Sequence, residues 1–304
     1  MNGILAVWKP AGWTSHDVVA KARRLLRTKR IGHAGTLDPE VTGVLPLCIG
    51  RATRVVEYMQ ELPKAYEAVL QFGVSTDTED LTGTVTETAL NVSLTEEQVR
   101  NALDSFVGEI EQVPPMYSAV RVDGKRLYEL AREGKVVERK KRKATIHEIQ
   151  LLSLDLEAAH PRITFHVTCS KGTYIRTLCV DIGKALGVPA AMASLKRTLS
   201  AGLTEADCLT LEQIEQLQGQ NAMIPRLLPV DAVLNHMDKL TVNHETAVLA
   251  LQGKKLAFDD VTPKPSGTGL TRLYNEDQTF LGIYEKDFNS GLIRPVKVFS
   301  PVES

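Results

Sequence analysis

Long apolar runs and paired cysteines are both missing from this 304-residue chain. No stretch approaches the ~20 apolar residues that cross a bilayer, so we expect no membrane span. Residues 1–9 lack a basic segment, a long apolar segment and a cleavage site, which argues against a signal peptide. The scattered cysteines argue against a disulfide framework and against zinc, and predict reduced thiols in the cytoplasm. They are Cys48, Cys169, Cys179 and Cys208.

A strong net charge is also missing, because the chain carries only −1 at neutral pH. The charges are nevertheless unevenly distributed. Residues 1–54 hold nine Lys and Arg against three Asp and Glu, and residues 121–143 hold ten against four. Local positive surfaces on a near-neutral protein are typical of a polyanion partner such as a nucleic acid. An ordinary solvated face explains either segment taken alone.

The most informative stretch is residues 30–50, which predicts a rigid loop that presents one carboxylate. Gly32 and Gly35 allow backbone angles closed to other residues, and Pro39 restricts Asp38 to extended conformations. Residues 41–49 are apolar and β-branched, which predicts a buried strand behind the loop. A carboxylate held in this way suits covalent or acid–base chemistry. In an isolated TLDP segment, the aspartate more typically caps a turn. The choice between a capping and a chemical role for Asp38 therefore depends on the rest of the chain.

The flanking segments predict alternating strands and helices. We expect strands at residues 4–8 and 64–72 and a helix that begins after Thr14 or Ser15, with a basic strip on its outer face. In the strand at 64–72, half-buried packing is the usual role of a residue such as Tyr66. Lys9 is interpreted equally well as a ligand-contacting cation or as a charge at a strand end.

Later segments add two helices and a small β-module. Ser93 and Glu96 predict a capping box before a helix that stops at Gly108. Arg176 falls in the first turn of a second helix, where a buried carboxylate partner or an extended path to solvent would accommodate it. Residues 194–198 are interpreted as a turn. A short helix at 241–255 and strands at 270–274, 280–284 and 292–299 predict a β-barrel module.

Seven ordered motifs connect these segments to a known family. They are KPAGWTS at 9–15, GHAGTLDP at 32–39, TGVL at 42–45, KAY at 64–66, TDTED at 76–80, PPMYSAV at 114–120 and SKGTYIR at 170–176. With them the chain resembles, essentially from end to end, the bacterial TruB family of tRNA pseudouridine synthases. Two departures are Val41, where many members have alanine, and Trp8, where an aspartate is common. Neither residue has a proposed chemical role.

The resemblance implies an α+β fold and a reaction. The fold is a pseudouridine synthase domain at residues 1–236, a mixed, largely antiparallel sheet with flanking helices, followed by a small PUA-like β-barrel at 237–304. An RNA-gripping thumb insertion is expected at about 117–143. The implied reaction converts the T-loop uridine of tRNA, position 55 in tRNA numbering, to pseudouridine with no cofactor and no metal. The partner is the T-arm and elbow of tRNA, with no obligate protein partner, and a monomer is the default.

The resemblance also assigns site residues. Asp38 matches the catalytic aspartate, Arg176 the arginine that pairs with it, and Tyr66 the aromatic that stacks on the target base. Flipping the base out costs a few kcal/mol, of which stacking returns ~1–3 kcal/mol. The substrate-binding residues are His33, Tyr174, Leu195 and Lys9. The basic arm expected on the RNA backbone comprises Arg121, Lys125, Arg126, Arg139, Lys140, Lys141, Arg142 and Lys143.

Other functions remain open from the sequence. Synthases that act on ribosomal RNA share the L-D-x-x-T-G core, but an arginine is expected there before the leucine, where this chain has Thr36. An RNA-binding or RNA-folding module would use the basic arm and the barrel equally well. A guide-RNA-dependent relative is disfavoured by the thumb-like insertion.

Overall fold

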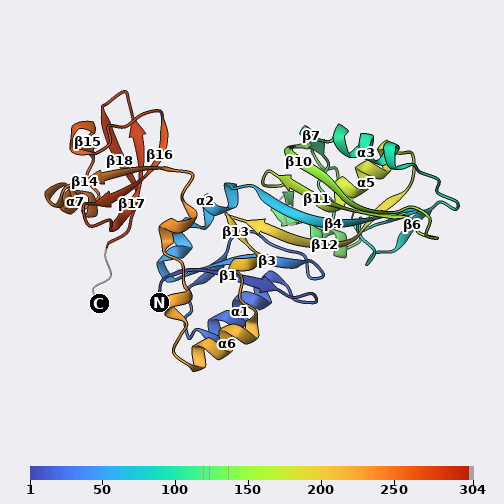
Figure 1. Ribbon diagram of the computed structural model, residues 1–304, viewed down its shortest axis with the longest axis horizontal. Coiled ribbons are helices and arrows are strands. Elements are labelled where there is room, and N and C mark those ends of the chain that lie inside the picture. Colours follow the sequence, from blue (N-terminus) through green and yellow to red (C-terminus); the bar gives the residue numbers. More distant parts are fainter. Residues whose placement is uncertain (119, 123, 136, 301–304) are drawn as a thin grey trace.

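The computed structural model describes residues 1–118, 120–122, 124–135 and 137–300, and Figure 1 shows how their helices and strands are arranged. Nine strands of this part form one sheet, in the order β1-β3-β12-β4-β11-β10-β7, with β2 beside β3 and β13 beside β12. Neighbouring strands are antiparallel except β3 and β12, which run parallel. The predicted mixed, largely antiparallel sheet is therefore confirmed.

The strands of this main sheet are β1 (Gly3–Lys9), β2 (Ile31–His33), β3 (Thr42–Ile49), β4 (Lys64–Phe72), β7 (Gly108–Gln112), β10 (Arg142–Asp155), β11 (Arg162–Cys169), β12 (Ala190–Ser200) and β13 (Leu203–Thr204). Its helices are α1 (Ser15–Leu25), α2 (Val56–Glu61), α3 (Glu96–Ser105), α4 (Leu127–Arg132), α5 (Ile175–Ala185) and α6 (Leu211–Gly219). Two small hairpins are β5 (Val74–Thr76) with β6 (Val85–Thr88) and β8 (Arg121–Val122) with β9 (Lys125–Arg126). Short 3-10 turns are η1 (Gly50–Val55), η2 (Glu205–Asp207), η3 (Ile224–Arg226), η4 (Val230–Val233) and η5 (Phe258–Asp260).

Two pairs of helices pack against the main sheet. Helices α1 and α6 lie side by side, and their apolar residues share one buried cluster with β1 and β3. Helices α3 and α5 pack at the other end of the sheet, in a cluster with β4 and β11. Because burying an apolar helix face is the main source of helical stability in a protein, these clusters fix where α1 and α5 begin. The first turns of both helices thereby come to lie beside the Asp38 loop.

The start of α3 differs from the sequence prediction. Its N-cap is Thr95, whose hydroxyl accepts from the backbone N–H of Gln98 at 3.2 Å, while the Gln98 side chain accepts from Thr95 N at 2.8 Å. Ser93 and Glu96 have the same spacing, but Glu96 is already the first helical residue. The predicted capping box was therefore placed two residues too early.

We expect Thr95→Ala to lower the free energy of unfolding by about 1 kcal/mol, the usual cost of a lost N-cap. Ser93→Ala is the control, and its expected effect is a few tenths of that value. Urea unfolding of the two variants measures the difference. Equal effects would contradict the observed cap.

The predicted turn at residues 194–198 is wrong, because these residues lie within β12. Strand β12 is hydrogen-bonded to β4 on one side and to β3 on the other. Glycine at position 43 allows β12 to approach β3 closely. The φ of Gly43 is +116°, and a Cβ there would lie 2.2 Å from the backbone oxygen of Arg197. The segment mixes apolar and basic residues, and this local pattern did not reveal its pairing with β3 and β4.

The second sheet forms a curled half-barrel, seen in orange and red in Figure 1. Its strands, in the order β14-β16-β17-β18-β15, are β14 (Asp238–Val242), β15 (Leu256–Ala257), β16 (Gly269–Asn275), β17 (Phe280–Asp287) and β18 (Leu292–Val298). The three strands predicted here are confirmed. The predicted helix is shorter than expected, because the side chain of Asn243 caps α7 (His244–Leu251) and residues 241–242 belong to β14. Residues 301–304 lie outside the described part.

The half-barrel is docked on the main sheet by both apolar and polar contacts. Phe299 lies in a buried cluster that includes Ile4 of β1 and Ile283 of β17. The Arg54 guanidinium lies 4.9 Å above the Phe299 ring and donates to the Val298 carbonyl at 2.5 Å. The division into domains at residues 236 and 237 stays a prediction.

Strand β1 forms one edge of the main sheet, and late segments of the chain cover that edge. Ile4 and Leu228 exchange two backbone hydrogen bonds, of 2.8 and 2.9 Å. Leu209 N donates to Ala6 O and Trp8 N donates to Leu209 O, both at 3.0 Å. An uncovered edge strand is a template for pairing with other chains, so these bridges complete the sheet. Among the described residues, no helix is long and apolar enough to span a bilayer.

Candidate active site

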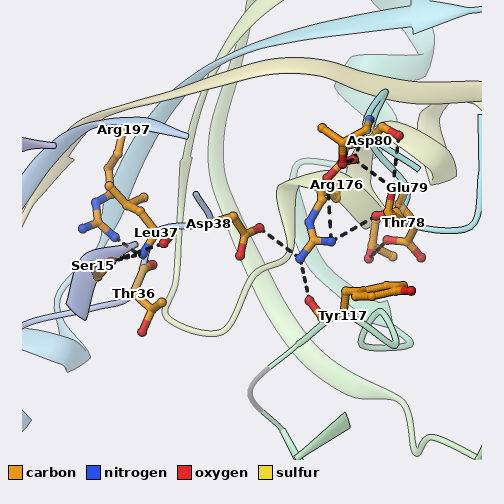
Figure 2. A network of polar contacts seen from close by, with 12 residues as sticks. Ser15, Thr36, Leu37, Asp38, Thr78, Glu79, Asp80, Tyr117, Arg176 and Arg197 are labelled. Atoms are coloured by element: carbon orange, nitrogen blue, oxygen red, sulfur yellow. Dashed lines mark hydrogen bonds and ion pairs between the residues drawn. The ribbon is translucent and has the colours of Figure 1, made fainter. Parts of the chain in front are cut away.

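Asp38 lies on the loop between β2 and β3, and the start of α1 holds this loop in place (Figure 2). The Ser15 hydroxyl accepts from Leu37 N at 2.9 Å and donates to Leu37 O at 3.2 Å. Gly12 N donates to the Pro39 carbonyl at 3.0 Å. The residues on both sides of Asp38 are therefore fixed by the chain that leads into α1, and the carboxylate is presented on a rigid loop, as the Gly and Pro pattern predicts.

Lys9 supports the loop from behind and is not among the residues that line the cavity, so the substrate contact expected from the resemblance stays a prediction. Its side chain is fully buried. The ammonium donates to the carbonyls of Pro10, Trp13 and Pro39 at 2.8, 2.5 and 2.7 Å, so all three of its N–H donors are used. Burial lowers the pKa of Lys9 to about 8. Its role is to position the turn that follows Asp38.

The structure pairs Asp38 with Arg176, as the first-turn position of the arginine suggested. Arg176 Nη2 lies 3.0 Å from Asp38 Oδ2. The arginine side chain is only 8% exposed, whereas the aspartate side chain is 46% exposed. A nearly buried cation thus faces a carboxylate that remains open to a ligand. The guanidinium directs the carboxylate and supplies the local positive charge.

Two further segments hold the guanidinium of Arg176 in its orientation. Its Nη1 donates to the Thr78 carbonyl at 3.0 Å, and its Nη2 donates to the Tyr117 carbonyl at 2.8 Å, as Figure 2 shows. Asp80 Oδ2 lies 4.0 Å from Nη1. The acidic loop after β5 therefore serves as an anchor for the arginine. Because all these partners lie on other elements, Arg176 cannot rotate away from Asp38 without losing several contacts.

These residues surround a cavity of about 430 Å³, a volume in the usual range of small-molecule sites. Five of the predicted site residues line it: Asp38, Tyr66, Tyr174, Arg176 and Leu195. Residues that the sequence did not single out also line it: Lys64, Lys171 and Arg197. A planar polar ring would find an aromatic face, an aliphatic face and the Asp38 carboxylate here. Such a combination suits nucleophilic or acid–base attack by the carboxylate on a bound heterocyclic substrate.

Tyr66 is buried in β4 and presents part of its ring to the cavity. Burial raises the pKa of its hydroxyl, and the nearby Arg197 guanidinium partly opposes that rise. Tyr174 directly precedes α5, and burial likewise raises its pKa. The side-chain amide of Gln112 fixes the Tyr174 backbone, accepting from its N–H at 2.9 Å and donating to its carbonyl at 3.1 Å.

Arg197 is the most deeply buried of the site residues that sequence reasoning missed. It is 1% exposed, and its guanidinium donates to the carbonyls of Val44, Gly35 and Thr36 at 2.8, 3.1 and 3.5 Å. In the β4–β12 pairing it lies opposite Tyr66. Burial lowers the pKa of the guanidinium. This one side chain joins β12, β3 and the loop that carries Asp38. Its position in an apolar-plus-basic segment gave no signal of burial.

His33 lies at the end of β2, half-buried and outside the residues that line the cavity. Its ring stands edge-on to that of His16, with the ring centroids 5.5 Å apart. Burial lowers the pKa of His33, so the neutral ring is favoured. His33 and the exposed His16 therefore flank the loop on the side of α1, next to the cavity but not in its wall.

The described residues of the thumb insertion predicted at about 117–143, which carries the basic arm, include several helices and strands. Arg142 and Lys143 begin strand β10, and the described residues before them form the β8–β9 hairpin and α4. Residues 119, 123 and 136 lie outside the described part. Arg139 donates to the Pro114 carbonyl at 3.0 Å. Several lysines of the arm form ion pairs: Lys125 with Glu133, Lys141 with Glu111 and Lys143 with Glu109, at 3.1, 3.3 and 2.7 Å.

No group of three or more His, Cys, Asp or Glu suited to a metal ion occurs in the described ranges. The expectation that the reaction needs no metal and no cofactor stays a prediction.

Comparison with known proteins places the chain next to one family. Residues 23–175 match the model described as "TruB family pseudouridylate synthase (N terminal domain)", and residues 176–235 match "tRNA pseudouridylate synthase B C-terminal domain". The tRNA pseudouridine synthase B of Bacillus licheniformis is 46% identical over 98% of this chain and 97% of its own length. That of Bacillus subtilis is 43% identical over 98% and 97%.

A solved structure gives the same picture of the fold. In a Cbf5-Nop10-Gar1 complex, a chain 25% identical in sequence superposes with a TM-score of 0.77 over 98% of this chain and 85% of its own. The superposition covers both the main sheet and the half-barrel.

Proposed function

Because the chain belongs to the TruB family of pseudouridylate synthases, we propose that it isomerises uridine 55 in the T-loop of tRNA to pseudouridine. It is a tRNA pseudouridine synthase, an isomerase. The position of the target and the roles of the residues are the proposed part. The observation that carries them is the 3.0 Å ion pair of Asp38 and Arg176, at a cavity that Tyr66 lines.

In the proposed reaction the C1′–N1 bond of the uridine breaks, the base turns over, and a C1′–C5 bond forms. The C5 proton leaves to solvent and N1 gains a proton, so the atoms balance and the rearrangement needs no oxidant or cofactor. Asp38 supplies the carboxylate, which either attacks the sugar or takes a proton from it. Arg176 keeps this carboxylate directed at the cavity, since its other donors are bound to fixed carbonyls.

The target uridine lies within a folded loop, so we propose that it flips into the cavity. Unstacking costs a few kcal/mol, and stacking on Tyr66 returns ~1–3 kcal/mol. Leu195 and Tyr174 complete the pocket walls. His33, beside the loop but outside the pocket, is placed to fill the stack that the uridine leaves.

The proposed partner is the T-arm and elbow of tRNA. Within the basic arm, the cations for which the described residues provide no acidic partner are Arg121, Arg126, Arg139, Lys140 and Arg142, and we propose these for the RNA backbone. The chain is proposed to act as a monomer in the cytoplasm, without an obligate protein partner.

Lys64 gives the proposed site a pH dependence. This residue lines the cavity, its ammonium donates to the carbonyls of Gln60 and Leu62 at 2.9 and 3.0 Å, and burial lowers its pKa to about 8. The charge is present below pH 8 and lost above it. We therefore expect the KM for tRNA to rise about tenfold from pH 7 to pH 9, the equivalent of one lost charged hydrogen bond. Steady-state kinetics across this range measures the rise.

Lys64→Arg is the control for this rise, because a guanidinium stays charged throughout the range. The variant leaves Lys9, whose pKa is also about 8, unchanged. The KM of Lys64→Arg is expected to stay nearly constant with pH. The same rise in both proteins would contradict the role given to Lys64.

The test of the function uses tRNA tritiated at uridine C5, with purified protein and a chelator. One equivalent of tritium per tRNA is expected to be released, and none from a transcript that carries cytidine at position 55. Release from the cytidine transcript would overturn the proposed position. Release from ribosomal RNA alone would overturn the substrate. Absence of release from any RNA, with tRNA binding intact, would support an RNA-binding module instead.

A further inference from the structure

A second set of cations, outside the predicted arm, lies at the end of α1 and the start of β2. We call it the α1–β2 surface, and it comprises Arg23, Arg24, Arg27, Lys29 and Arg30. All five are exposed. Within the described ranges none of them forms an ion pair. These five positive charges are therefore not neutralised by the protein itself.

Two of these side chains are held by neutral groups rather than by acids. Arg23 Nη2 donates to the Ile31 carbonyl at 2.9 Å, and Arg30 Nε donates to the Thr53 hydroxyl at 2.9 Å. Such bonds fix the position of a guanidinium, keep its full charge and leave further N–H donors free. Ordered cations with free donors are suited to phosphate oxygens.

The basic arm and its flanking Lys135 differ, because several of their lysines have acidic partners. Lys125 and Lys135 share Glu133, while Lys141 and Lys143 pair with acids on the neighbouring strand β7. A phosphate would have to displace these carboxylates, which reduces the net gain from each contact. The arm therefore has fewer cations available to a phosphate than its sequence contains. In the α1–β2 surface, by contrast, all five cations lack an acidic partner among the described residues.

The location of the α1–β2 surface relates it to the active site along two elements. Helix α1 has 11 residues, or ~16 Å at 1.5 Å per residue, and its first residue, Ser15, is bonded to Leu37 beside Asp38. Strand β2 begins directly after Arg30 and leads into the same loop. The cations at the far end of α1 therefore lie roughly 16 Å from the reacting carboxylate.

We propose that the α1–β2 surface binds the phosphate backbone of the paired stem that adjoins the target loop. This inference rests on the proposed function. A distance of ~16 Å corresponds to several base pairs along one strand of such a stem, so these cations are within reach of its phosphates. A loop nucleotide in the cavity would thus place the backbone of its own stem over α1 and β2.

The test is the salt dependence of tRNA binding by the triple variant Arg24→Gln/Arg27→Gln/Lys29→Gln. Each lost phosphate contact reduces the slope of log K against log salt concentration by ~0.7–0.9, so we expect a reduction of about two. The Kd at low salt is expected to rise at least tenfold. These side chains are exposed, so the thermal unfolding curve is expected to match that of the unaltered protein.

The matched control is Lys135→Gln/Lys141→Gln/Lys143→Gln, which removes three cations that have acidic partners. Its salt slope is expected to fall by well under one and its Kd to rise less than threefold. An equal effect of the two triple variants would overturn the inference, because it would indicate a response to total charge alone.

Two further outcomes separate this inference from the proposed function. The defect of the α1–β2 variant is expected to persist with an isolated T-arm hairpin, and a defect confined to whole tRNA would overturn the placement on the adjoining stem. If the unaltered protein releases tritium but the variant keeps the full salt slope, the inference fails and the function stands. If the unaltered protein neither binds tRNA nor releases tritium, the proposed function fails first.

Discussion

Asp38→Asn is expected to reduce turnover of tRNA by roughly a thousandfold or more, while the affinity for tRNA changes less than about threefold. Asparagine has nearly the same shape as aspartate, but its amide can neither attack the sugar nor accept a proton from it. Arg176 keeps its bonds to the carbonyls of Thr78 and Tyr117 in the variant, so the pocket is expected to hold its form. The loop is also held independently through Leu37 and Pro39.

Single-turnover tritium release and equilibrium tRNA binding, measured on the same preparation, check this expectation. Asp38→Glu is the companion variant, because it keeps the charge and moves it by one methylene. Its expected turnover lies between those of the other two proteins. A parallel loss of tRNA binding and turnover in Asp38→Asn would contradict the chemical role of Asp38, since it would indicate a damaged pocket.

Arg197→Met is expected to have the largest effect on stability, with a loss of unfolding free energy on the order of 3 kcal/mol. The substitution leaves buried carbonyls of Val44, Gly35 and Thr36 without their donor. It also removes the side chain that lies opposite Tyr66 and bonds the loop of Asp38. Activity is expected to fall further than the folded fraction, because the loop loses its anchor even in folded molecules.

The control for Arg197 is its neighbour on the same strand. Lys196 points to the surface, where it pairs with Glu67 at 3.1 Å. Exposed pairs of this kind contribute less than ~1 kcal/mol, so Lys196→Met is expected to have little effect on urea unfolding. Similar stabilities of the two variants would show that the buried guanidinium is not an anchor.

Much of the site could be predicted because its signals are local. The Gly and Pro pattern around Asp38 predicts a rigid loop. The position of Arg176 in the first turn of a helix favours an acidic partner for its side chain. Both features depend on a few neighbouring residues, and the structure brings the two side chains together. Tyr66, Tyr174 and Leu195 came from the resemblance, and all three line the same cavity.

The contacts that local patterns could not predict have partners far away in the sequence. The sequence left the role of Lys9 open, because the Pro39 carbonyl that binds it belongs to the next loop. The burial of Arg197 was missed because it depends on the parallel pairing of β12 with β3. The ion pairs of Lys141 and Lys143 were missed because Glu111 and Glu109 lie about 30 residues earlier.

The start of α3 was missed for a different reason. Two candidate caps with identical spacing, at Ser93 and Thr95, precede the helix, and either one satisfies the local rule. Both starts leave Val99 and Leu103 on the same buried face, and the structure uses Thr95, which bonds reciprocally with Gln98. Propensity alone does not contain that information.

The bridges across the edge of β1 have a consequence for the order in which the protein is made. Strand β1 leaves the ribosome well before the residues that cover its edge, because Leu209 and Leu228 are synthesised some 200 residues later. At ~5–20 residues per second this delay lasts on the order of ten seconds or more. During that interval the nascent chain carries an apolar strand with an open side, so the final closure of the sheet is an event of late translation.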